Sequence, residues 1–309
     1  MANSAATEPV TGSFLVRFLW LSLATAVATV VIKGVAALLT GSVGLLSDAL
    51  ESTVNLVAAA VAIWALRLSD KPADHNHDFG HGKAEYMSSL VEGALIFVAA
   101  AAIIISAIVR FINPQPVESL GIGLLLSVVA SVLNLGVGLV LIRQGRRHRS
   151  ITLEADGHHL LADVWTSVGV LVGMGLLLLT GWHWVDPLVA MAVGFNILWT
   201  GGKLLRRSTV GLLDAALPAA EVELIRTALA DVIDDPRMTV TELLTRESGR
   251  QRFVQATVIV PGHWTVRRSH DLADSIELAI AQVLPDTVTV VHIEPGPSEL
   301  PADPSARLA

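Results

Sequence analysis

The 309-residue chain contains no cysteine and is poor in charged and aromatic residues. The absence of cysteine excludes disulfide frameworks, thiol catalysis, iron–sulfur clusters and cysteine-type zinc fingers. Charged residues make up 16% of the chain, against roughly 25% in a soluble domain. Together with 52% hydrophobic residues, this predicts an integral membrane protein. The net charge of −7 argues against nucleic-acid partners, because nucleic-acid-binding proteins normally carry a basic face.

The charge is distributed unevenly along the chain. The ranges 119–142 and 164–185 contain no charged residue, whereas 207–309 holds 9 arginines and 15 acidic residues. We therefore expect a membrane domain over 14–206 and an aqueous domain over 207–294. The first 13 residues lack the basic start of a cleaved signal peptide. These residues and the Pro-rich stretch 295–309 are predicted to be disordered.

The membrane domain contains six segments long enough to cross a bilayer, which takes about 20 helical residues. They are expected at about 14–39, 43–68, 84–111, 117–142, 151–180 and 187–206. Lys and Arg gather in the connections after the second, fourth and sixth segments, and the other connections contain none. The positive-inside rule then predicts a multi-pass protein of the plasma (inner) membrane with both termini in the cytoplasm.

In the aqueous domain, the spacing of apolar residues alternates between a pattern typical of helices and one typical of strands. Residues 218–234 and 265–284 are typical of helices, whereas 239–245, 252–260 and 288–293 are typical of strands. The resulting order, α-β-β-α-β, predicts a small α+β domain with helices on one face of an open sheet.

Polar residues within the apolar segments are the first candidates for chemistry, because they are expensive in lipid. Glu51 and Asn55 are four residues apart in the second segment, and His159 and Asp163 are four apart in the fifth. Each pair shares one helix face. Two facing helices would offer four N and O ligands, which suits a tetrahedral divalent-cation site. The alternative is a set of interhelical hydrogen bonds that only holds the bundle together.

Other histidines and acids form weaker candidate sites. Asp48 lies three residues before Glu51 and is a possible relay, whereas His158 points away from His159 on the helix. In the loop after the second segment, a second metal could be bound by Asp74, His77 and His81. The alternative is a solvated polar loop with incidental histidines.

The aqueous domain has one further candidate set. His292 and Glu294 are two residues apart on the last strand and point to one face. His270 on the preceding helix and His263 before it could join them. A purely structural role is the alternative, because this spacing is common by chance.

Several motifs, taken in order, resemble the cation diffusion facilitator family of divalent-metal/proton antiporters. They are GSVGLLSDALESTVN, PADHNHDFGHGKAE, EADGHHLLADVWTS, GLLDAALP and VVHIEP, and the resemblance covers about 14–295. It implies six transmembrane helices, cytoplasmic termini, a homodimer and a metallochaperone-like, ferredoxin-like cytosolic domain. It also implies a secondary active transporter and not an enzyme.

The resemblance assigns residues to sites. The transport site would be Glu51, Asn55, His159 and Asp163, although zinc-type members have Asp or His in place of Glu51 and Asp in place of Asn55. The loop site Asp74, His77 and His81 carries over completely. The cytosolic sites carry over in part: His270, His292 and Glu294 match, but Thr241 and Thr257 stand where zinc-type members place histidines. Lys83 and Asp214 match a charge interlock between the two domains.

Several functions remain open at this stage. The leading hypothesis is proton-coupled efflux of a divalent metal cation, with Zn²⁺ first and protons as the coupling ion. A site of three oxygens and one nitrogen also suits harder ions, so an Fe²⁺ or Mn²⁺ exporter, or one for Co²⁺ or Cd²⁺, is the alternative. An intramembrane metalloprotease would need an HExxH-type motif, and the chain has none. A membrane metal sensor or scaffold without transport is the alternative from another class.

Overall fold

The structure is a computed structural model that describes residues 12–40, 43–113, 121–180, 182 and 184–296. The chain divides into two compact units, Met1–Leu213 and Asp214–Ala309, which we call the membrane unit and the C-terminal unit. The ends predicted to be disordered lie almost entirely outside the described residues. Gly12 and Ser13 belong to the first helix, and Pro295 ends the last strand.

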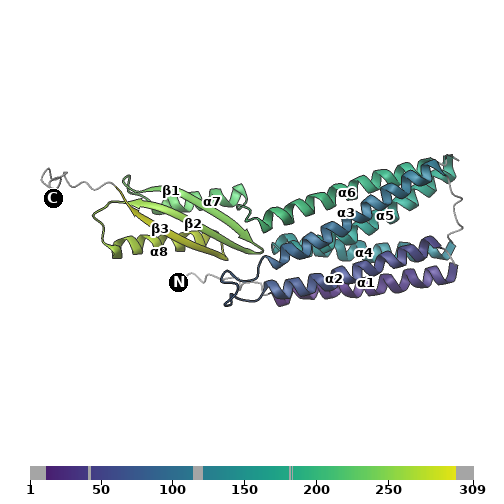
Figure 1. Cartoon of the computed structure of the whole chain (residues 1–309), viewed down its shortest axis with the longest axis horizontal. Coiled ribbons are helices and arrows are strands. Elements are labelled where there is room, and N and C mark those ends of the chain that lie inside the picture. The colour runs from purple at the N-terminus through teal and green to yellow at the C-terminus, as the bar shows by residue number, and fades with distance from the viewer. Residues whose placement is uncertain (1–11, 41–42, 114–120, 181, 183, 297–309) are drawn as a thin grey trace, which may run out of the picture. The chain divides into compact units, whose positions relative to one another are not determined.

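The membrane unit contains the six predicted helices (Figure 1). They are α1 (Gly12–Thr40), α2 (Val43–Ser69), α3 (Ala84–Ile112), α4 (Gly121–Arg147), α5 (Ile151–Thr180) and α6 (Val185–Leu212). Two helices run past their expected ends at 142 and 206. The extension of α4 is rich in arginine, a good helix former, and Arg146 within it bonds to Glu154 at 3.1 Å. Charge pairing therefore prolongs α4 beyond its apolar stretch.

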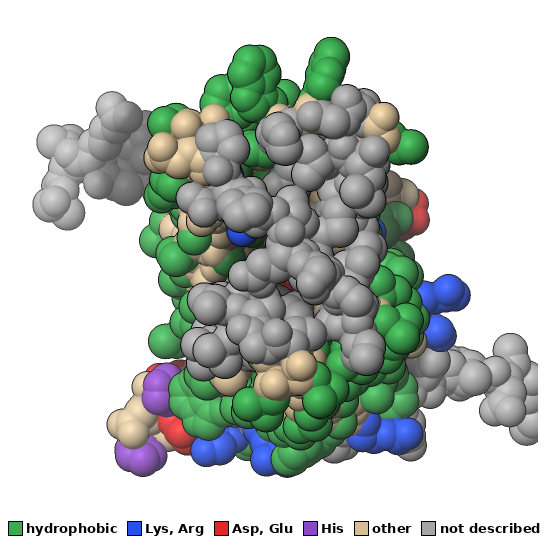
Figure 2. Space-filling model, turned by 90° about the vertical axis from the view of Figure 1, so that its right-hand side faces the viewer, with side chains coloured by type: hydrophobic (Ala, Val, Ile, Leu, Met, Phe, Trp, Pro, Cys, Tyr) green, Lys and Arg blue, Asp and Glu red, His purple; other side chains and the backbone are tan. Residues whose placement is uncertain are grey.

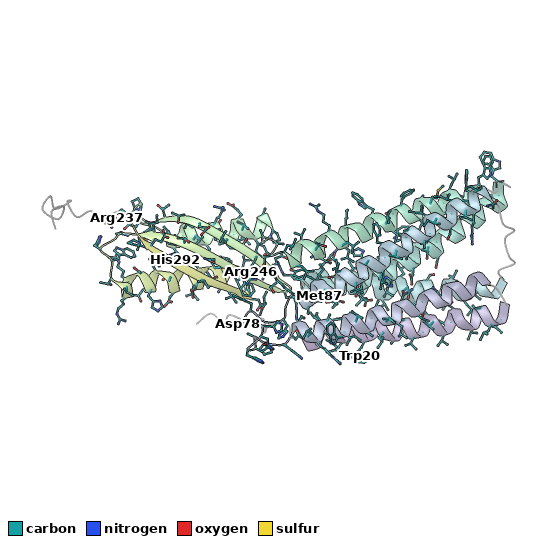
Figure 3. The ribbon with its side chains drawn as sticks, viewed as in Figure 1. Trp20, Asp78, Met87, Arg237, Arg246 and His292 are labelled. Carbon is teal, nitrogen blue, oxygen red and sulfur yellow. The ribbon has the colours of Figure 1, made fainter. Side chains whose placement is uncertain are left out.

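Among the described residues, four helical stretches are apolar and long enough to span a membrane: Phe14–Leu39, Ala84–Ile112, Leu125–Arg147 and Pro187–Leu212. A shorter apolar stretch, Asn55–Ser69, lies in α2. The polar candidate residues lie on α2 and α5, with Asn55 at the start of that shorter stretch. Large apolar side chains such as Leu38 and Val98 are exposed on the outside of the bundle, and Trp20 projects from α1 (Figure 3). Hydrophobic side chains also form most of the visible rim of the bundle in Figure 2. Such a surface suits lipid.

Within the membrane unit, α1 packs on α2, α3 on α6, and α4 on α5 (Figure 1). One buried cluster joins α1, α2, α4 and α5 through leucines, among them Leu19, Leu66, Leu141 and Leu160. These contacts hold α2 and α5 in the same part of the bundle, although other helices separate them in sequence.

Glycines set the distance between α4 and α5. A Cβ at Gly157 would lie 2.7 Å from Ile142 Cγ1 and 2.8 Å from the Gly138 carbonyl oxygen. A Cβ at Gly145 would lie 2.7 Å from the Glu154 backbone nitrogen. Small residues at helix contacts allow the backbones to approach closely in membranes. The α4–α5 spacing therefore depends on the absence of side chains at these positions.

The C-terminal unit has the predicted αββαβ order. It consists of α7 (Ala219–Val232), β1 (Thr239–Ser248), β2 (Gln251–Val260), α8 (Val266–Val283) and β3 (Thr287–Pro295). The sheet order is β1-β2-β3, with β1 antiparallel and β3 parallel to β2. A parallel neighbour requires a crossover connection, and α8 supplies it, starting at the Thr265 cap, whose side chain accepts from Arg268 N–H.

The core of the C-terminal unit lies between the sheet and its two helices (Figure 1). Ile225 of α7, Ile276 and Ile280 of α8, and Val258 of β2 are each 0% exposed. Alternate residues of the strands face away from these helices. Among them are Leu244, Val290 and His292, and all three are exposed. One face of the sheet is therefore covered within the unit and the other is open.

We predict that Gly157→Ala destabilises the membrane unit by roughly 1–3 kcal/mol, because the added methyl group overpacks the α4–α5 contact. Gly136→Ala on α4 is the matched control, since a Cβ there meets nothing within 4 Å and a helical Gly→Ala change is favourable. Thermal unfolding of the purified full chain in detergent measures both. Equal midpoints for the two variants would contradict the close approach.

Candidate metal centre

The structure brings together three of the four residues predicted to form a metal site. Asn55 Nδ2 of α2 donates to Asp163 Oδ2 of α5 at 2.5 Å, and Asn55 Oδ1 lies 2.6 Å from His159 Nε2. Asn55 is 3% exposed and His159 is 6% exposed. The two helix faces predicted from the i, i+4 spacings thus meet inside the bundle.

The remaining predicted ligand is Glu51 of α2. Glu51 lies one helical turn before Asn55 in α2, and its side chain is outside the described residues, as is that of Asp48. The backbone of α2 places Glu51 on the same helix face as Asn55.

Asn134 of α4 also contacts this group, and sequence reasoning did not single it out. It is 1% exposed, and its Nδ2 donates to Asp163 Oδ2 at 3.3 Å. Its Oδ1 is buried without a hydrogen-bond partner in the described part of the chain. The available signal was an amide within an otherwise uncharged apolar segment, which is unusual in a membrane helix.

The group offers donors suited to a divalent cation. Asp163 supplies carboxylate oxygens, the two asparagines supply amide oxygens, and His159 supplies a ring nitrogen. Because an amide oxygen only accepts, His159 Nε2 carries its proton in the contact with Asn55, and the buried Nδ1 has no described partner. A cation bound between these side chains would replace their mutual hydrogen bonds and shift the ring proton away from the ligating nitrogen.

The loop between α2 and α3 holds a second group of potential ligands. Ligand atoms of Asp74, His77 and His81 all lie within 4.8 Å of one another, and Figure 3 labels Asp78 in the same loop. Asp74 Oδ1 is 3.2 Å from His77 Nδ1, and Asp74 Oδ2 is 3.5 Å from His81 Nε2. Among the described residues this is the one set of three His or acidic side chains with that geometry.

Hydrogen bonds keep the loop carboxylate charged. The Asn76 backbone N–H, the His77 side chain and the charge of His81 lower the pKa of Asp74, although partial burial opposes them. Asp74 therefore stays ionised further into the acid range than an ordinary aspartate. A cation can therefore bind to this carboxylate and the two neighbouring imidazoles without first displacing a proton from the acid.

The four candidate residues of the C-terminal unit are not gathered into one such set. His292 Nε2 and Glu294 Oε1 on β3 lie 3.6 Å apart, whereas His270 on α8 faces Asp274 at 3.6 Å. His263 lies in the turn before α8, and all four side chains are exposed. Thr257 of β2 is the register partner of His292, and Thr241 Oγ1 donates to the Thr257 carbonyl at 3.4 Å. Thr257 and Thr241 thus place hydroxyl groups, and not imidazoles, near His292, which Figure 3 labels on the sheet.

The two residues predicted to form an interlock have partners within their own units. Lys83 Nζ donates to the Leu212 carbonyl at 3.2 Å, and Asp214 accepts from Arg246 at 3.0 Å.

Comparison with known proteins identifies the family. A model of the cation efflux transmembrane domain matches residues 19–213, and a model of the cation efflux protein cytoplasmic domain matches residues 217–296. The uncharacterized transporter sll1263 of Synechocystis sp. is 49% identical over 296 residues, which are 93% of this chain and 94% of that relative. The cation-efflux pump FieF of Klebsiella pneumoniae is 32% identical over 280 residues (90% and 92%), and that of Shewanella oneidensis is 31% identical over 275 residues (89% and 92%).

These relatives are transporters and not enzymes, and they confirm the resemblance drawn from the motifs. The chain is a multi-pass membrane protein that belongs to the cation efflux, or cation diffusion facilitator, family.

Proposed function

We propose that this protein exports a divalent metal cation, Zn²⁺ first, from the cytoplasm in exchange for protons. The transport site consists of Glu51, Asn55, His159 and Asp163. The observation that carries the proposal is the buried contact of Asn55 with both His159 and Asp163. A set of polar side chains is costly inside an apolar bundle unless it has partners or a function, and this set has the donor types of a metal site.

Asn134 joins this site as a positioning residue. Its amide holds Asp163 from the α4 side, while Asn55 holds the same oxygen from the α2 side. Three helices thereby fix one carboxylate. A fixed carboxylate keeps its oxygens aimed at the cation position.

Charge supports a divalent ion. Asn55 is neutral, so the site has two carboxylates, Glu51 and Asp163, beside a neutral His159. Their charge of −2 matches one divalent cation, and the empty site takes up protons to relieve the same charge. Three oxygens and one nitrogen suit Zn²⁺, while Fe²⁺, Mn²⁺, Co²⁺ and Cd²⁺ are the alternative ions of this proposal.

The proposal includes the setting of the transporter. The basic α4–α5 connection and the positive-inside rule support cytoplasmic termini in the plasma (inner) membrane. The C-terminal unit leaves one sheet face open with Leu244, Val290 and His292 on it, which supports a homodimer. A role as a metal sensor without transport is the competing function, and it requires no metal flux.

His159→Ala should lower metal flux by more than roughly tenfold, because it removes a ligand. Removing only a residue that hydrogen-bonds to a metal ligand already costs about tenfold or more in metal affinity or activity. His158→Ala is the matched control: the neighbouring imidazole faces Glu154 at 3.9 Å and lies outside the ligand set. The measurement is Zn²⁺ flux and proton movement in sealed proteoliposomes with the membrane potential clamped. Equal flux in the two variants would contradict the site, and flux without proton movement would contradict exchange.

Asn55→Asp should change the metal preference or the turnover and leave the fold intact. The added charge replaces the amide that donates to Asp163, so the site would hold its ion more strongly and release it more slowly. Flux is compared for Zn²⁺, Fe²⁺ and Mn²⁺, and detergent-solubilised chain is checked by gel filtration. Unchanged selectivity and rate would show that Asn55 is not a ligand.

His77→Ala should remove the loop metal, with the affinity falling by more than roughly tenfold for a lost ligand. His75→Ala is the control, because this exposed histidine belongs to the same loop but not to the three-residue set. Zinc binding to the full chain is titrated at several pH values. Affinity should fall on acidification because protons compete with the metal for the ligand atoms, while Asp74, with its lowered pKa, stays ionised. Identical titrations for both variants would rule out the loop site.

A further inference from the structure

Two carboxyl groups lie buried in the membrane unit apart from the proposed ligands. Glu92 belongs to α3 and is 0% exposed, and Asp156 belongs to α5 and is 1% exposed. Helices α3 and α5 pack against each other, and the two carboxyl groups interact electrostatically. Ser88 Oγ donates to Glu92 Oε1 at 3.4 Å, and Ser22 of α1 lies beside Asp156. Polar side chains of α1, α3 and α5 therefore form one buried cluster.

The part of the chain that the structure describes places no cationic side chain against this pair. Among the described side chains, no lysine, arginine or histidine pairs with either carboxylate. Glu92 Oε2, Asp156 Oδ2 and Ser22 Oγ are buried and have no hydrogen-bond partner in the described part of the chain. Each carboxyl group thus has an oxygen available for a further ligand.

The other titratable or charged groups on the packed helices are engaged elsewhere. Glu85 on α3 accepts from Ser150 at 2.6 Å, and His159 on α5 lies 2.6 Å from Asn55. Lys203 of α6 and Arg67 of α2 lie over tryptophan rings. Lys33 lies about 16 Å along α1 from Ser22. On α5, Glu154 is bound by Arg146 and Arg207, His158 faces Glu154 at 3.9 Å, and Asp163 accepts from Asn55 and Asn134.

Two ionised carboxylates cannot share a buried, uncompensated position at low cost, because each charge is desolvated and repels the other. One bound proton removes half of the charge, and the two interacting groups then take up and release protons as a pair. We propose that Glu92 and Asp156 form a proton-binding site of the membrane unit, distinct from the metal ligands.

The position of Asp156 on α5 connects this site to the metal ligands. Asp156, His159 and Asp163 are spaced i, i+3 and i+7, so they follow one helix face. Asp156 lies about 4.5 Å along the axis from His159 and about 10.5 Å from Asp163. A divalent cation bound at His159 and Asp163 repels a proton at Asp156 through this low-dielectric interior.

Metal binding then breaks the carboxylic O–H bond and releases the proton, and the bound ion compensates the new negative charge. By linkage, protonation of the pair weakens metal binding by the same factor. This inference rests on the proposed exchange function, and it assigns one of the exchanged protons to groups that do not touch the metal.

The test measures protons released when Zn²⁺ binds to purified full-length protein in weak buffer. All proteins carry His77→Ala, which removes the loop as a source of protons. Glu92→Gln keeps the side-chain shape and should release about one proton fewer per metal, so the slope of log affinity against pH falls by about one. Glu92→Asp retains a carboxyl group and should behave like the parent protein. The infrared band of a carboxylic acid should disappear when the parent binds Zn²⁺.

The outcomes separate this inference from the proposed function. An unchanged proton count in Glu92→Gln would overturn the proton site, even where His159→Ala still abolishes metal binding. The proton site would also be overturned if Glu92→Gln bound one Zn²⁺ fewer than the parent protein and the number of protons released per bound Zn²⁺ did not change. If His159→Ala binds and transports metal normally, the proposed function itself fails. An infrared band that persists in Asp156→Asn and in the metal-bound parent would overturn the proton site without reference to Glu92.

Discussion

The cost of placing polar groups in an apolar bundle governs the membrane unit. An ionisable residue at the centre of a membrane helix costs roughly 2.5–3.5 kcal/mol on insertion scales. Accordingly, Asn55, Asn134, His159 and Asp163 are turned toward one another, and large side chains such as Leu38 and Val98 cover the outside. The same constraint places the candidate chemistry on α2 and α5, the helices whose apolar stretches are interrupted.

The geometry of that polar group depends on helix contacts with no polar character. The backbones of α4 and α5 lie close together because three positions at their contact are glycines, Gly138, Gly145 and Gly157. This close packing brings Asn134 Nδ2 within 3.3 Å of Asp163 Oδ2. Leucines from α1, α2, α4 and α5 hold α2 against α5. Close apolar packing thus sets hydrogen-bond distances that the polar side chains could not impose alone.

Helix α5 carries two buried acids that differ in their partners: Glu154 is paired with arginines, and Asp156 has no cationic partner among the described residues. Glu154 accepts from Arg146 at 3.1 Å and from Arg207 at 2.5 Å, so it joins α4, α5 and α6 as an ion-pair cluster. Asp156, two residues later, is buried, and it interacts electrostatically with Glu92. An ion pair such as that of Glu154 holds helices together, whereas a buried acid without a counter-charge among the described residues is a candidate for binding a cation or a proton.

The six helices, the αββαβ order of the C-terminal unit and the family could all be predicted from the sequence, because uncharged runs, periodicity and ordered motifs are local properties of the chain. It also predicted which faces of α2 and α5 are polar, since residues four apart share a helix face. The sequence did not predict that Asn134 reaches Asp163 or that Glu92 and Asp156 interact electrostatically. Nor did it predict that the candidate ligands of the C-terminal unit are not gathered into one set among the described residues; these are His263, His270, His292 and Glu294. Each of these outcomes depends on which helices and strands become neighbours, and packing between segments distant in sequence makes that choice.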